Sequence, residues 1–199
     1  MELIIIIVAI TAIIVIYSMM NMKIKELKAI ALNQELNEIA KKLPTNKEIC
    51  EQILKKLGNN TTKIEENENS EATLYIAIQD KITIGNTHES FTRIQTVAHE
   101  CLHSIQDKKM LIFNFIFSNI YLVFFIIICI LTVCKKLSNE IMYSNIFLIL
   151  SFIYYVIRVF LENDAMIKAQ FLAREYMQES KYIDNSEIDK IYHGFEELN

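Results

Sequence analysis

The sequence predicts a mainly α-helical membrane protein with a small β-hairpin, an α+β fold with about three transmembrane helices. Of its 199 residues 52% are hydrophobic, and it contains a single proline. Three apolar runs have about the length of a membrane span, and amphipathic helical patterns occupy much of the remaining chain. One short stretch alternates apolar and polar residues in the way that a strand does.

The first apolar run begins at Leu3 and ends between Tyr17 and Met20, which predicts an N-terminal transmembrane anchor over residues 1–20. Only Glu2 carries a charge before it, so the run lacks the positive start of a secretory signal, and no small-residue cleavage site follows it. We therefore expect an uncleaved anchor, and a cleaved signal peptide is the alternative.

Residues 21–110 form the polar part of the chain, and their first half predicts two helices. Residues 22–42 have the apolar spacing of one amphipathic helix, which ends before Pro44.

A second helix is expected over residues 47–57, where either Thr45 or Asn46 can cap its first turn. The following residues, 59–71, are polar and acidic, and this composition predicts a loop.

Residues 72–84 alternate apolar and polar side chains around the turn-forming triplet Gln79-Asp80-Lys81, which predicts a β-hairpin. The apolar positions of the two strands are Leu74, Ile76, Ile78, Ile82 and Ile84. The exposed edge of such a hairpin could pair with an extended peptide, and a purely structural hairpin is the alternative.

The pentapeptide from His99 to His103 has the pattern HExxH. Residues four apart lie on one face of a helix, so His99 and His103 can bind one zinc ion together. Glu100 follows the first of them, in a position to take a proton from a water bound to that ion. The pattern predicts a zinc hydrolase of the peptidase type in a zincin-like domain, whereas two histidines on an ordinary amphipathic helix are the plain alternative.

A catalytic zinc ion usually has three protein ligands and one open position, so a third ligand must come from elsewhere in the chain. Glu162 is the preferred candidate, with Asp164 accepting a hydrogen bond from the free ring nitrogen of a ligand histidine. The other two histidines, His88 and His193, are weaker candidates. Glu162 and Asp164 could instead be the solvated polar start of a helix.

Two further apolar runs, residues 111–134 and 144–161, predict the second and third transmembrane helices, and residues 162–199 then form a C-terminal helical segment. Arg158 near the end of the third span can extend to the membrane interface. Three polar residues in the second span can bond to neighbouring helices or line a wet cavity. These are Asn114, Ser118 and Asn119.

The predicted topology tests the choice of Glu162. Two crossings separate the HExxH helix from Glu162, so both end on the same side of the membrane, as a single metal site requires. Basic residues place that side in the cytoplasm by the positive-inside rule, although Lys135 and Lys136 argue for the opposite orientation. The supporting residues are Lys23, Lys25, Lys28, Lys108, Lys109, Lys168 and Arg174.

This order of segments resembles the bacterial membrane-bound neutral zinc metallopeptidases, the YugP-type membrane proteases. The resemblance covers roughly residues 5–175 and depends mainly on the HExxH helix and on the sequence Glu162-Asn163-Asp164-Ala165. It implies one zinc ion per chain held by His99, His103 and Glu162, in the plasma membrane. Members usually have a glycine immediately before the second motif histidine, where this chain has Leu102.

The expected activity is hydrolysis of a protein or peptide substrate, with Glu100 as general base and a donor that stabilises the oxyanion. Tyr192, His193 and Arg174 are the candidate donors. An inactive membrane zinc protein, acting as a structural or partner-binding module, is the alternative; it is disfavoured because a structural zinc site needs no base. A transporter or channel subunit fits a complete hydrolase motif less well.

Composition limits the partners and cofactors further. The formal net charge is −4 and no basic stripe is present, so nucleic acid is not expected as a partner, whereas the lipid bilayer is. The four cysteines have no paired spacing, and we expect them to be reduced packing residues. They are Cys50, Cys101, Cys129 and Cys134.

Overall fold

The computed structural model describes residues 25–67, 69–70, 72–86 and 90–198, together with the single residues 11, 14, 15 and 18. The expected N-terminal anchor therefore lies largely outside the described residues, and His88 lies outside them as well.

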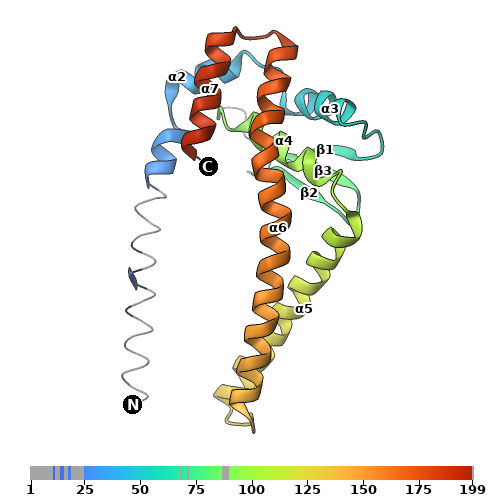
Figure 1. Ribbon diagram of the computed structural model, residues 1–199, viewed down its shortest axis with the longest axis vertical. Coiled ribbons are helices and arrows are strands. Elements are labelled where there is room, and N and C mark those ends of the chain that lie inside the picture. The colour runs from blue at the N-terminus through green and yellow to red at the C-terminus, as the bar shows by residue number, and fades with distance from the viewer. Residues whose placement is uncertain are drawn as a thin grey trace.

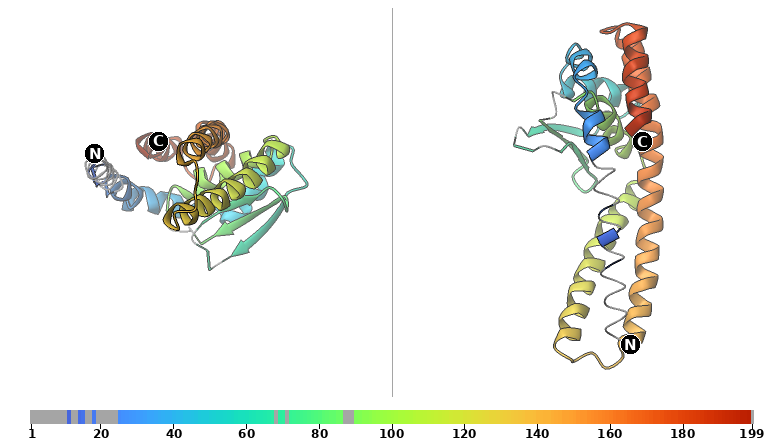
Figure 2. Two further views of the ribbon diagram at one scale, coloured as in Figure 1. Left: turned by 90° about the horizontal axis from the view of Figure 1, so that it is seen from below. Right: turned by 90° about the vertical axis from the view of Figure 1, so that its left-hand side faces the viewer.

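The described chain is mainly helical with one small sheet, as the sequence predicts (Figure 1). Its elements are α2 (Gln34–Lys41), α3 (Asn46–Lys56), β1 (Lys63–Asn67), β2 (Leu74–Ile76), β3 (Lys81–Gly85), α4 (Arg93–His103), α5 (Lys108–Val133), α6 (Glu140–Ser180) and α7 (Asn185–Leu198). Helix α4 lies between the sheet and α6, and α5 and the first half of α6 extend away from this domain as a pair of long helices (Figures 1 and 2).

The segment expected to form one helix over residues 22–42 is broken near its middle. Residues 25–31 are helical, and α2 then begins after Asn33, whose side chain accepts a hydrogen bond from the backbone N–H of Leu36. An asparagine side chain that caps a new helix competes with the continuous helix, which explains why apolar spacing alone missed the break. Helix α3 begins with a capping box between Thr45 and Glu48.

The predicted hairpin is present as β2 and β3, which pair antiparallel with Leu74 opposite Thr83. A third strand was missed, because β1 forms within the segment expected to be a loop over residues 59–71. It pairs parallel with β3, and of its side chains only Ile64 packs against the core. The sequence of β1 has almost no alternating pattern of apolar and polar residues. The strand depends on its pairing with β3 instead, which the sequence of β1 alone does not indicate.

Helices α5 and α6 are each long and apolar enough to cross a membrane. Within the described protein 0% of the most apolar stretch of α5 and 6% of that of α6 is buried, whereas a core helix of a soluble protein would be mostly buried. The helices pack together through Tyr121, which stacks on Phe147 and Tyr154 and shares a 2.7 Å hydrogen bond with Ser151.

The third predicted span and the start of the C-terminal segment belong to one helix. Helix α6 continues through Leu161 and Glu162 to Ser180 and ends at Lys181, which has a left-handed φ of 55°. Helix α7 then folds back along the end of α6 and contacts α2 (Figure 2). The sequence changes from apolar to polar residues near Glu162, and this change predicts a boundary between two segments there. A helix can pass from an apolar to a polar environment without a break, and α6 does so.

A buried arginine ties the beginning of α4 to the first two helices. Arg93 is 2% exposed, and its guanidinium donates to the carbonyls of Ala40, Leu43 and Pro44 and to Asn46 Oδ1 at 2.7–3.0 Å. These acceptors surround the connection between α2 and α3, so one side chain satisfies backbone groups that burial would otherwise leave unpaired.

Replacing Arg93 with leucine should destabilise the fold by more than about 3 kcal/mol, because several buried acceptors each lose a charged donor. For a chain of this size that loss corresponds to a thermal midpoint at least about 6 °C lower, measured by circular dichroism in detergent. The control Arg174→Leu removes a surface ion pair with Asp189 and a contact with the ring of Tyr192, and should cost less than about 2 kcal/mol. An equal decrease of the thermal midpoint in the two variants would contradict this role of Arg93.

Candidate metal centre

Helix α4 holds the HExxH motif in the middle of the domain. Its residues Val97, Ala98 and Cys101 are fully buried, and His103 and Glu100 are each 9% exposed. Helix α4 packs against α3, α6 and the sheet, and these contacts fix its position. The rings of His99 and His103 project from one face of α4 at successive turns.

Helix α6 brings the third candidate ligand to the same place. Ala165, Ala169 and Ala173 lie on one face of α6 and are fully buried where this helix packs along α4. Small side chains allow two helix axes to approach closely. Glu162 lies one turn before Ala165 on the same face, so the packing of the alanines directs its carboxylate toward the two histidines.

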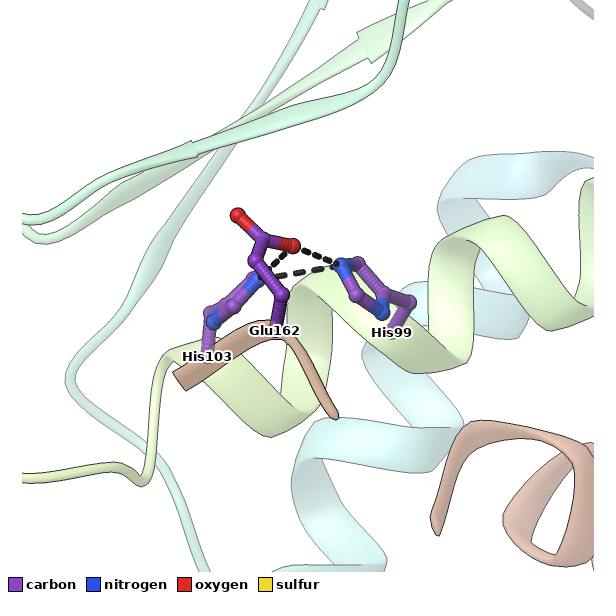
Figure 3. Close-up of side chains that lie close together, drawn as sticks. All are labelled: His99, His103 and Glu162. Carbon is purple, nitrogen blue, oxygen red and sulfur yellow. Dashed lines mark hydrogen bonds and ion pairs between the residues drawn. The ribbon is translucent and has the colours of Figure 1, made fainter. Parts of the chain in front are cut away.

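The three side chains converge from the two helices (Figure 3). The Nε2 atoms of His99 and His103 are 3.0 Å apart, and Glu162 Oε2 lies 3.4 Å from the first and 3.7 Å from the second. Ligand atoms of a tetrahedral zinc ion with bonds near 2.1 Å are about 3.4 Å apart. The observed distances bracket this value, so the cluster could hold a metal ion without a change in the backbone.

A glutamine orients one of the two rings. The Nδ1–H of His103 donates to Gln106 Oε1 at 2.8 Å, and Gln106 Nε2 donates to the carbonyl of Leu161 and to Asp164 Oδ2. With its proton on Nδ1, the ring of His103 can offer the Nε2 lone pair to a metal ion. His99 Nδ1 has no hydrogen-bond partner among the described residues.

Asp164 therefore acts differently from the sequence-based prediction, which placed it directly on a ligand histidine. It accepts from Gln106 and forms an ion pair with Lys168 at 2.5 Å. Two residues along a helix correspond to a rotation of about 200°, so Asp164 and Glu162 cannot face the same ring. Gln106 spans the gap, and Asp164 supports His103 through it.

Glu100 is buried beside the cluster and is held by the sheet. Its Oε2 accepts a 2.6 Å hydrogen bond from the backbone N–H of Tyr75 in β2. Burial raises the pKa of Glu100, while the bond from Tyr75 and the nearby histidines oppose that rise only in part. A carboxylate with a raised pKa is a stronger base, which suits proton transfer.

His103 has the opposite balance of effects. Burial alone would lower its pKa, but its contacts with Glu162 and Gln106 and the charge of Glu100 raise the pKa overall. A proton and a metal ion compete for the same Nε2 lone pair, so binding of a metal at this position requires the neutral ring.

The cluster opens into a cavity of about 580 Å³. One wall is the edge of the sheet from Leu74 to Gln79, and the others come from α4, the start of α5 and the middle of α6. Arg158, one turn before Glu162 on α6, lines this cavity and donates to the hydroxyl of Tyr154 at 2.7 Å. The sequence suggested only a membrane-interface role for Arg158.

The three candidate oxyanion donors do not line the cavity. Arg174 is twelve residues beyond Glu162, about 18 Å along α6, and it pairs with Asp189 and lies over the ring of Tyr192. His193 is exposed on α7 next to Glu196 and Glu197. Arg174 lies far along α6 from the cluster, and Tyr192 and His193 are on α7, so the structure does not bring these candidate donors to the cavity.

Two residues that matter at the site were not found from the sequence. Gln106 follows the motif by one turn, and its position after a ligand histidine was a usable signal. The contribution of Tyr75 comes from its backbone, so no side-chain pattern could have indicated it.

No protein-family model matches the chain, and no curated protein and no solved structure is significantly similar to it.

Replacing Glu162 with alanine should abolish tight metal binding, because two histidines remain and the third ligand is lost. The affinity for Zn²⁺ should fall by more than the roughly 100-fold that loss of a supporting contact can cause. The zinc content of the purified protein and a titration with Zn²⁺ measure this affinity. Glu175→Ala, on the same helix but ion-paired with Lys56, is the control and should bind normally. Unchanged zinc content in Glu162→Ala would exclude Glu162 as a ligand.

Replacing Gln106 with leucine should lower Zn²⁺ affinity about 10- to 100-fold, since the ring of His103 loses the partner that fixes its tautomer. The exposed Gln52 of α3 provides the control Gln52→Leu, which should leave the affinity unchanged. Equal affinities for Gln106→Leu and the wild-type protein would show that His103 needs no such support.

Proposed function

We propose that this chain is a membrane zinc metallopeptidase, and the convergence of His99, His103 and Glu162 next to a buried Glu100 is the observation that supports it most directly. Two imidazole nitrogens and one carboxylate oxygen form a donor set that suits zinc, with one position left open. A structural zinc site usually has four protein ligands, and only three ligand groups gather here among the described residues.

When bound, a zinc ion supplies a Lewis acid that makes water a nucleophile near neutral pH. The protein's own residues account for the remaining chemistry. Glu100 takes the proton of the attacking water and passes it to the leaving amine of the peptide bond, and its burial makes it basic enough to do so. Tyr75 holds the Glu100 carboxylate through its backbone N–H, so the base does not swing away from the cavity.

Arg158 is the cavity-lining cation and replaces the three donors suggested by the sequence as the candidate partner of substrate oxygen atoms. Its guanidinium carries several N–H donors and stays protonated. It can donate to the oxyanion that forms at the peptide carbonyl or to a neighbouring substrate carbonyl.

The proposed location is the bacterial plasma membrane, with the metal centre on the cytoplasmic side. The apolar surface of α5 and α6 supports membrane insertion. The basic residues on the domain side of the spans support this orientation and outnumber Lys135 and Lys136, which oppose it. The HExxH helix and the Glu-x-Asp-Ala sequence, on which the expected likeness to YugP-type membrane proteases depends, supply the residues of the cluster.

Replacing Glu100 with glutamine should leave zinc binding intact and reduce kcat/KM for a peptide or unfolded protein at least about 100-fold, because the base is lost while the ligands remain. Hydrolysis and zinc content are measured on the same detergent-purified sample. Glu51→Gln, at an exposed position of α3, is the matched control and should keep full activity.

Full activity in Glu100→Gln would exclude the proposed mechanism. One zinc ion in both proteins without cleavage by either would favour the inactive zinc protein, in which the site has a structural or partner-binding role. No zinc in the wild-type protein would contradict the metal centre itself.

A further inference from the structure

The cavity next to the metal cluster extends into the part of the protein that would lie within the membrane. On α5 it is lined by Leu111, Asn114, Phe115 and Ser118. Leu111 lies at the start of the apolar stretch of that helix, two residues after Lys109, and the wall from Leu111 to Ser118 extends about 10 Å along the stretch. On α6 the cavity reaches Arg158, one turn farther toward the membrane than Glu162.

The opposite wall is also apolar, although it belongs to the polar domain. Leu74 and Ile78 line the cavity from the sheet and its turn, and they are 54% and 56% exposed. Large apolar side chains that surround a catalytic cluster and stay exposed usually mark a binding surface. A soluble polar peptide would gain little from these walls, whereas an apolar segment at the bilayer surface would bury itself against them.

Two polar groups inside this apolar cavity match the needs of a peptide backbone. Asn114 Oδ1 is buried and has no hydrogen-bond partner among the described residues. A buried acceptor left unpaired is unfavourable, and a substrate N–H would relieve this once the Asn114 side chain turns Oδ1 toward the cavity. Arg158 offers the complementary donors on the other helix. An extended backbone, which must satisfy both its N–H and its C=O groups in an apolar site, would find one partner on each wall.

We propose that the substrate is an apolar peptide segment presented at the bilayer surface, held by Asn114 and Arg158 with its side chains between β2 and the membrane ends of α5 and α6. This inference rests on the proposed peptidase function and specifies its substrate class. Asn114 is a positioning residue here, because it binds a backbone N–H away from the reacting carbonyl.

The test uses three substrates that share one unfolded segment with alternating leucine and valine. In the first substrate one copy of this segment directly adjoins each end of an apolar transmembrane helix. A copy then lies on each side of the bilayer, so the direction of insertion has no effect. The second has a spacer of about 20 Gly and Ser residues between helix and segment, which can separate them by up to about 70 Å. The third lacks the transmembrane helix. The full chain and each substrate are reconstituted in phosphatidylcholine vesicles, and cleavage positions are read by mass spectrometry.

The first substrate should be cleaved next to the bilayer at least about tenfold faster than the other two, as expected when apolar burial favours the membrane-near segment by more than about 1.4 kcal/mol. Both anchored substrates have the same concentration in the bilayer, so anchoring alone predicts equal rates for them. Equal rates for the first and second substrates, abolished in both by Glu100→Gln, would overturn this inference and leave the peptidase function standing. Cleavage of none of the three by a zinc-loaded protein would overturn both.

Asn114→Leu tests the positioning residue directly. Loss of one hydrogen bond should raise the apparent KM for the first substrate about fivefold, with kcat changed less than about twofold. Asn119→Leu, on the same helix, is the matched control, since Asn119 bonds to the backbone of Phe115 and does not line the cavity. Zinc content verifies that both variants fold. An unchanged KM in Asn114→Leu, or the same increase in both variants, would exclude this role of Asn114.

Discussion

The close packing of α6 on α4 is the constraint on which the rest of the structure depends. The stripe formed by Ala165, Ala169 and Ala173 lets the two helices approach, and a larger side chain at any of these positions would separate them. The position of Glu162 is set by this packing rather than by a loop. A carboxylate on a packed helix keeps its distance from the two histidines within the narrow limits that a metal requires.

The same arrangement connects the cluster of His99, His103 and Glu162 to the sheet and to the two long apolar helices. Glu100 faces β2 and is held by the N–H of Tyr75, while His103 is held through Gln106 to Asp164 on α6. The base and one ligand are thus oriented from opposite sides of α4. Each of these supports comes from a different element, so the site forms only when the sheet, α4 and α6 are all in place.

Helix α6 has a double role because it does not end at the predicted membrane boundary. Its first half pairs with α5 through Tyr121 and Ser151, and its second half forms part of the core of the domain. Because α6 is continuous, its apolar first half and Glu162 have fixed positions relative to each other. The wall of the cavity that α6 forms contains no loop. This continuity is the feature on which the proposed site at the bilayer surface depends.

The helix-rich class, the two long apolar helices and the hairpin could be predicted from the sequence. The grouping of His99, His103 and Glu162 beside Glu100 could be predicted as well, because it follows from local spacing and from the predicted order of the spans. Only the tertiary structure decided the break at Asn33, the strand β1, the role of Gln106 and the exclusion of Arg174, Tyr192 and His193 from the cavity. The physical reason is the range of the interactions. Helical and strand patterns are local, whereas β1 depends on pairing with β3, and the surroundings of Glu162 depend on the direction of α6 over forty residues.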